Sequence, residues 1–139
     1  MMNYFQIFFG GFIASLAWFL AGSALYLNPL VARIYKNAEN SPGLKRWSNI
    51  PKYIALQYVG IAVQCLLWAF VFALVKPALP EKLMIRGLLF GLILLLLKIV
   101  PRFIDMWIQS TYPNKLLFVE FVNGTIGSFI IGVALAYTI

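Results

Sequence analysis

Four long apolar stretches, separated by short polar segments, dominate the chain. The first covers about 4–27 and the second about 53–75, both without a charged residue. The fourth covers about 116–138 and contains one charge, Glu120. Because about 20 apolar residues cross roughly 30 Å of hydrocarbon, each stretch is long enough for a transmembrane helix. The pattern predicts an all-α integral membrane protein, a four-helix bundle.

The third stretch is interrupted by charged residues. Its uncharged centre covers only 87–97, between Arg86 and Lys98. These two residues are about 18 Å apart along a helix, so each long side chain can extend to its own membrane interface. We place the span over about 83–100, with Pro101 ending or kinking the helix. The span extends over 83–106 if residues 103–107 continue the helix, and these residues otherwise lie in the headgroup layer.

A short amphipathic helix is predicted between the first two spans. Leu30, Ile34 and Tyr35 recur at helical spacing over about 29–38, with basic residues between them. Asn28 directly precedes Pro29 and is a suitable N-cap. Such a helix fits the membrane surface.

Composition narrows the protein class. The chain has 139 residues, of which 63% are hydrophobic and 11% charged, with a mean hydropathy of +0.89. A soluble chain of this size cannot bury that much apolar surface, so the surplus must face lipid. We expect one polytopic domain over 1–139, and we exclude a soluble globular domain, a disordered chain and a nucleic-acid-binding module. The first stretch has no preceding Lys or Arg and is too long for a signal peptide, so we expect it to remain as a span.

The distribution of basic residues predicts the orientation. With four spans, the loops 29–52 and 107–115 share one side, and both termini share the other. The loop side has the larger share of basic residues, namely Arg33, Lys36, Lys45, Arg46, Lys52, Lys98, Arg102 and Lys115. The positive-inside rule therefore predicts that these loops are cytoplasmic and the termini outside, in a prokaryotic inner membrane. Lys45 and Arg46 could also bind an anionic lipid, although orientation alone explains a basic loop.

Residues suited to catalysis are scarce. The chain has no His and a single Cys, Cys65, which excludes an internal disulfide, the usual zinc sites, His-ligated haem and a CxxC redox pair. Folding could bring Asp105 and Glu120 together for a phosphotransferase-like reaction on a metal, but no motif supports two isolated acids. We expect no enzyme, no metal and no cofactor.

Polar residues gather at the loop-side ends of the four spans. The candidate ligand-binding cluster comprises Asn28, Gln57, Lys98, Arg102, Asp105, Glu120 and Asn123. One interpretation is a polar vestibule for an ion or solute, with Glu120 paired to Arg102 or Lys98. The other, which we favour at this stage because span ends are normally polar, is a structural salt bridge between the third and fourth spans.

Small residues form a ridge along the fourth span. Its members are Gly124, Gly127, Ser128, Gly132 and Ala136. Such a ridge allows close helix packing, preferably against the first span within one bundle, or alternatively in a homo-oligomer. Gln64, near the middle of the second span, is expected to pair with Ser15 or Ser128 across helices.

Two resemblances bear on the family. The segment 123–129 with Gly132 resembles part of the small dual-topology fluoride channels, but it lies in the wrong span and the accompanying Arg and filter segment are missing, so that assignment is rejected. Gly22, Tyr26, Pro29 and Leu30, followed by Tyr35, are similar to a pattern in small uncharacterised four-helix membrane proteins, which are domains of unknown function.

Two functions follow as hypotheses. The first is a non-enzymatic accessory or interaction subunit, whose partners are the lipid bilayer and other membrane helices. The alternative is a small oligomeric channel or transporter that uses the polar cluster. We favour the first at this stage, because no charge lies near the middle of the first, second or fourth span, where a transporter's coupling residue is expected.

Overall fold

The computed structural model describes all 139 residues and is an all-helical bundle, which confirms the predicted fold class. The long helices give the protein four segments that are long and apolar enough to cross a membrane, as in a multi-pass membrane protein. The elements are α1 (Tyr4–Tyr26), α2 (Pro29–Asn37), α3 (Ile50–Val75), η1 (Lys76–Ala78), α4 (Leu83–Leu94), η2 (Leu95–Ile99), α5 (Val100–Gln109) and α6 (Asn114–Thr138).

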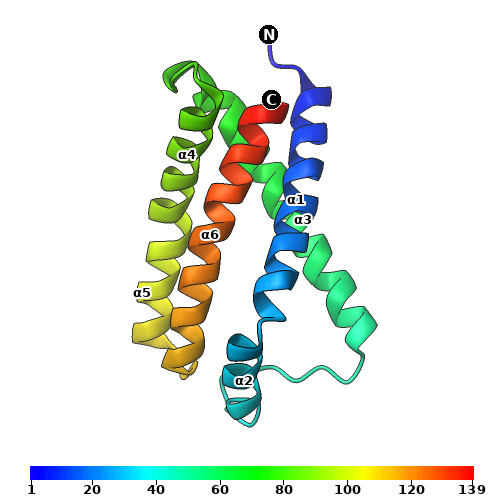
Figure 1. Ribbon diagram of the computed structural model, residues 1–139, viewed down its shortest axis with the longest axis vertical. Coiled ribbons are helices and arrows are strands. Elements are labelled where there is room, and N and C mark those ends of the chain that lie inside the picture. The colour runs from blue at the N-terminus through cyan, green and yellow to red at the C-terminus, as the bar shows by residue number, and fades with distance from the viewer.

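Both termini lie at one end of the bundle, and α2 lies at the other (Figure 1). The end with α2, the segment 38–49 and the α5–α6 turn is called the loop side below. The predicted surface helix is present, and the Asn28 side chain caps it by accepting a hydrogen bond from the Leu30 N–H at 2.9 Å.

The third span is longer than its charge pattern suggested. Helices α4 and α5 join through η2 into one helical segment, Leu83–Gln109, of 27 residues and about 40 Å. Pro101 does not end the helix, because the turn before it widens into a π-helix in which the Val100 N–H donates to the Leu95 carbonyl. A π turn accommodates the missing N–H and the ring of a proline inside a helix. Residues 103–107 therefore continue the span.

This extension changes the position of Lys98. Arg86 reaches the end of its helix, where its Nε donates to the Pro80 carbonyl at 2.8 Å. Lys98 lies 11 residues before Gln109, about 16 Å along the helix, and is therefore inside the span. The expectation that Lys98 extends to its own interface assumed a helix ending near Val100.

Helix α6 lies between α4 and α1 and packs closely on both (Figure 1). A methyl group added at Gly132 would lie 2.7 Å from the backbone nitrogen of Gly91 and would also overlap the Gly87 carbonyl. Five residues earlier on the ridge, a methyl group at Gly127 would lie 2.7 Å from the Trp18 ring of α1. The ridge thus faces the third span as well as the first, and both contacts lie within one chain.

The main hydrophobic core cluster lies in the half of the bundle near the termini. There Phe72 of α3 and Phe90 of α4 meet edge to face, with ring centroids 5.0 Å apart, and both are fully buried. Towards the loop side α3 diverges from α1 (Figure 1). The amino-terminal half of α3 therefore has few neighbours within the chain, and the loop-side half of the bundle is open.

The Gly132 contact leads to a stability prediction. Gly132→Ala should destabilise the purified protein by about 1–3 kcal/mol, because the methyl group forces α4 away from α6. Gly60→Ala is the matched control, since nothing lies within 4 Å of a methyl group built there. The measurement is the thermal unfolding midpoint in mild detergent, and equal midpoints for the two variants would contradict the proposed packing.

Candidate functional site

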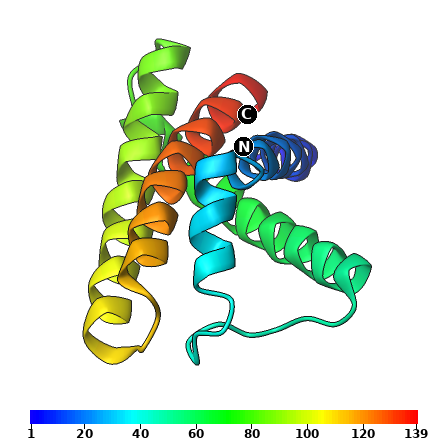
Figure 2. The ribbon, with the colours of Figure 1, turned by 60° about the horizontal axis from the view of Figure 1, so that its bottom comes forward.

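A cavity of about 910 Å³ occupies the loop-side half of the bundle. It is lined by residues of α1, α2, α3, η2, α5 and α6 and by residues 43–45 of the connecting segment. Helices α3 and α5 lie at opposite edges of the molecule, with α6 and α2 between them (Figure 2). The cavity lies between α3, which packs along α1, and α5, which follows α6, and residues of α2 form part of its lining.

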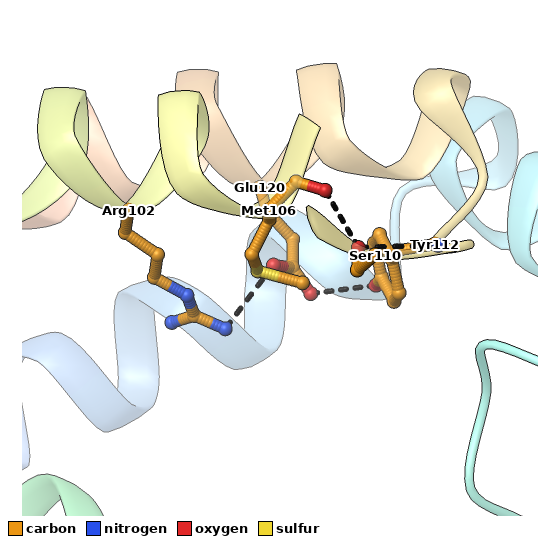
Figure 3. A network of polar contacts seen from close by, with 5 residues as sticks. All are labelled: Arg102, Met106, Ser110, Tyr112 and Glu120. Carbon is orange, nitrogen blue, oxygen red and sulfur yellow. Dashed lines mark hydrogen bonds and ion pairs between the residues drawn. The ribbon is translucent and has the colours of Figure 1, made fainter. Parts of the chain in front are cut away.

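Glu120 holds the polar contacts at one wall of this cavity. Arg102 Nη2 of α5 lies 3.4 Å from Glu120 Oε2, and the Tyr112 hydroxyl donates to Glu120 Oε1 at 2.7 Å (Figure 3). Of the two cations expected to pair with Glu120, Arg102 is the one that does so. Both carboxylate oxygens therefore already have a partner within the chain.

The α5–α6 turn positions Tyr112 for this contact. The Ser110 hydroxyl donates to the Met106 carbonyl at 2.7 Å, which caps the end of α5. The same hydroxyl oxygen accepts the Tyr112 N–H at 3.3 Å. The turn is thereby fixed so that the Tyr112 side chain points back to Glu120 (Figure 3).

The Arg102–Glu120 pair is a weak structural link. The Arg102 side chain is 62% exposed and that of Glu120 is 24% exposed. Ion pairs that reach solvent contribute only about 0–1 kcal/mol, since water and salt screen them. A purely structural role of this ion pair would not explain why Gln57, Gln64 and Lys98 also line the cavity.

Tyrosine hydroxyls extend the polar wall from Glu120 to α2. Tyr35 of α2 meets Tyr26 edge to face, with ring centroids 5.7 Å apart. Burial raises the pKa of Tyr35, and the neighbouring Tyr26, Tyr112 and Glu120 raise it further. Burial also raises the pKa of Tyr112, reinforced by its hydrogen bond to Glu120 and by the negative charge of that carboxylate. Tyr35 and Tyr112 are therefore neutral hydrogen-bonding groups at physiological pH.

The cavity brings together four of the seven residues of the predicted cluster: Gln57, Lys98, Arg102 and Glu120. The other three are not part of its lining. Asn28 is the exposed cap of α2, and Asp105 is exposed one turn beyond Arg102. Asn123 is only 5% exposed within α6, and its Nδ2 has no hydrogen-bond partner.

The sequence reasoning missed the tyrosines and Gln64. Tyr26, Tyr53 and Tyr112 line the cavity together with Tyr35. Their concentration near the loop-side ends of the spans was the available signal.

Gln64 also lines the cavity, and its expected pairing with Ser15 or Ser128 is wrong. Ser15 Oγ lies 3.3 Å from the Tyr58 hydroxyl, and Ser128 Oγ donates to the Gly124 carbonyl at 2.8 Å. Both serines therefore have other partners.

The connecting segment covers the loop-side end of the cavity. A methyl group at Gly43 would lie 2.9 Å from Tyr112 Cα, so this segment packs directly on the α5–α6 turn. Lys45 lines the cavity, and its Nζ lies 4.6 Å from the Trp47 ring centroid. Arg46 instead binds within the segment, to Asn40 and to the Glu39 carbonyl.

Comparison with known families gives one match. A family model described as "Protein of unknown function (DUF1761)" matches residues 10–136. The chain belongs to the DUF1761 family. The match runs from α1 to α6 and thus includes every element that lines the cavity of this DUF1761 protein. It confirms the resemblance to uncharacterised proteins of unknown function. Neither the curated proteins nor the solved structures contain a match to the chain.

The Tyr112 contact predicts an alkaline loss of stability. In the folded protein the pKa of Tyr112 lies above its ordinary value of 10.0. Its contribution is therefore complete below about pH 10 and declines as the pH rises towards the folded-state pKa. Tyr112→Phe should cost about 1 kcal/mol at neutral pH and reduce the alkaline decline. The measurement is thermal unfolding across a pH series, with exposed Tyr4→Phe as the control. Equal pH profiles for the two variants would refute this assignment.

The packing of Gly43 predicts a change in loop protection. Gly43→Val should lift the segment 38–49 from the α5–α6 turn, because the added side chain collides with the Tyr112 backbone. Trypsin should then cleave after Lys45 or Arg46 faster than in wild type, measured by mass spectrometry of the fragments. Gly60→Val serves as the control at an open position, and unchanged cleavage in Gly43→Val would argue against this contact.

Proposed function

We propose that this DUF1761 protein is a small, non-enzymatic membrane protein that binds a ligand in the loop-side cavity. The observation that carries the proposal is a set of polar side chains that line this cavity within the spans and have no partner in the chain. Lys98, Gln57 and Gln64 line it and make no hydrogen bond or ion pair with the protein. Polar groups at membrane depth are costly, so their side chains normally face a partner, water or a substrate.

The arrangement of the acids supports binding over catalysis. Asp105 is exposed outside the cavity, and both oxygens of Glu120 are engaged by Arg102 and Tyr112. The two carboxylates thus do not converge on one site, as metal-assisted phosphoryl transfer would need. The groups that remain free are amides and cations, which can recognise a ligand through hydrogen bonds and charge.

The shape of the cavity supports binding over conduction by one chain. The half of the bundle near the termini is filled by the buried side chains around Phe72 and Phe90. A solute that enters from the loop side therefore meets a closed core. In our proposal the loop side faces the cytoplasm, because most of the basic residues lie there. Transport across the bilayer would additionally require this core to open or several chains to combine.

The accessory-subunit role is the second candidate. It is favoured by the exposure of α3. Only 17% of an apolar 18-residue stretch of this span is buried within the chain. A helix of a partner subunit or of a second copy could pack along this face. In that case the polar lining would complement polar groups of the partner.

Cysteine accessibility tests whether the cavity is open to aqueous ligands. In a Cys65→Ala background, Gln64→Cys should react with a membrane-impermeant maleimide in proteoliposomes, because Gln64 lines the cavity. Val63→Cys is the matched control, since Val63 is the adjacent residue, does not line the cavity and is 52% exposed, so that in a membrane it would face lipid. Equal failure of both positions to react would refute a hydrated binding cavity.

A further inference from the structure

Lys98 is a membrane-embedded cation without a counter-charge. It lies 11 residues, or about 16 Å, inside the loop-side end of its helix. The ion pair between Arg102 and Glu120 is the only one in the structure, and Lys98 makes none. A charged side chain at this depth is rare and usually pairs with another group or marks a functional pathway.

The protein offers Lys98 no suitable anion. Glu120 is the one acid in the cavity lining, and its two oxygens already bind Arg102 and Tyr112. Against this single carboxylate the lining has three cations, Lys45, Lys98 and Arg102. The cavity therefore has an excess of positive charge that an anionic ligand would neutralise.

Two walls of the cavity belong to membrane-spanning helices that pack on different neighbours. Gln57, Ile61 and Gln64 of α3 line one wall, and Lys98 and Arg102 line the other. These walls belong to helices that do not pack on one another, because α3 contacts mainly α1 while α5 contacts α6. The two helices lie at opposite edges of the molecule (Figure 2). A molecule in the membrane could therefore reach the cations laterally.

Most of the lining is apolar. Of its 25 residues, 15 are hydrophobic, among them Trp18, Ile99 and Phe121. A bare inorganic anion would leave these side chains against water. A chain of methylene groups would cover them, at a gain of about 0.8 kcal/mol per buried group.

The volume also fits a ligand of this class. The cavity has about 910 Å³, which is within the range of pockets for small ligands. Its size and its mixed polar and apolar lining suit an amphiphile with one headgroup and part of its acyl chains.

We propose that the cavity binds an anionic amphiphile from the bilayer, with its headgroup between Lys98 and Arg102 and its chains along the apolar lining. This inference rests on the proposed function and names the ligand class of the same site. Arg102 can contribute because a guanidinium has five donors, of which the carboxylate of Glu120 uses one. Lys98 supplies the charge that has no other partner.

Native mass spectrometry of the full chain in a nonionic detergent tests the proposal. The probes are short-chain phosphatidylglycerol, phosphatidylcholine with the same acyl chains, and inorganic phosphate alone. Phosphatidylglycerol should bind about tenfold more tightly than phosphatidylcholine, the difference expected for one charge-assisted contact. Inorganic phosphate should neither bind measurably nor displace phosphatidylglycerol.

Charge variants assign the effect to Lys98. Lys98→Gln should weaken phosphatidylglycerol binding about tenfold and leave phosphatidylcholine binding unchanged. Lys98→Arg should bind as wild type does, which keeps the test valid if the neutral variant folds poorly. Lys82→Gln is the matched control, because Lys82 is an exposed cation at the opposite end of the same span.

Several results would overturn the proposal. Equal affinity for the two lipids would show that the site does not recognise an anionic headgroup. Equal effects of Lys98→Gln and Lys82→Gln would show that Lys98 does not bind it. Displacement of the lipid by inorganic phosphate would show a site for a simple anion. A stoichiometric partner subunit that blocks lipid binding would assign the cavity to an acidic helix. If Gln64→Cys is labelled while the lipids bind equally, only the ligand class fails and the binding cavity stands.

Discussion

The close approach of α4 and α6 determines how the other helices can pack. Gly132 lies so near Gly87 and Gly91 that no side chain fits between the two backbones. This contact holds the whole segment Leu83–Gln109 along α6. Helix α3 then packs mainly on α1, on the other side of α6. The loop-side cavity is the space that remains between these two pairs.

The charge of the cavity depends on which of its ionisable side chains are paired within the chain. Arg102 and Tyr112 neutralise and satisfy Glu120, so the one acid of the lining is already balanced. Burial and the charge of Glu120 keep the tyrosines protonated, and they present donors without adding charge. What remains is positive. The electrostatic character of the cavity is therefore a property of its unpaired cations, chiefly Lys98.

The sequence predicted the fold class and span positions well, because both depend on the length and apolarity of local segments. The helix 29–38 and its cap at Asn28 were also predictable, since the capping residue and the amphipathic spacing are local. The end of the third span was not. Its extension past Pro101 depends on a π turn, which has no simple sequence signature.

The site was predicted in part for a related reason. Topology alone places Gln57, Arg102 and Glu120 at one end of the bundle, and the structure has them in one cavity. Topology cannot tell which face of a helix points inward, so it did not show that Asp105 lies outside the cavity lining or that Ser15 and Ser128 have partners other than Gln64. Tyr35 and Tyr112 depend on tertiary contacts between α2 and the α5–α6 turn.

The π turn at Leu95–Ile99 sets the rotation of α5 relative to α4, so the two halves of the span can present different faces to their neighbours. On its α4 side, the glycines must face α6 at close range, while on its α5 side Arg102 must face the cavity. One residue corresponds to about 100° of rotation around an α-helix. The length of this single turn therefore fixes the angle between the packing face and the polar face. A one-residue deletion there would turn Arg102 away from Glu120 and would also place Pro101 in an ordinary α-helix, where its ring and missing N–H are costly.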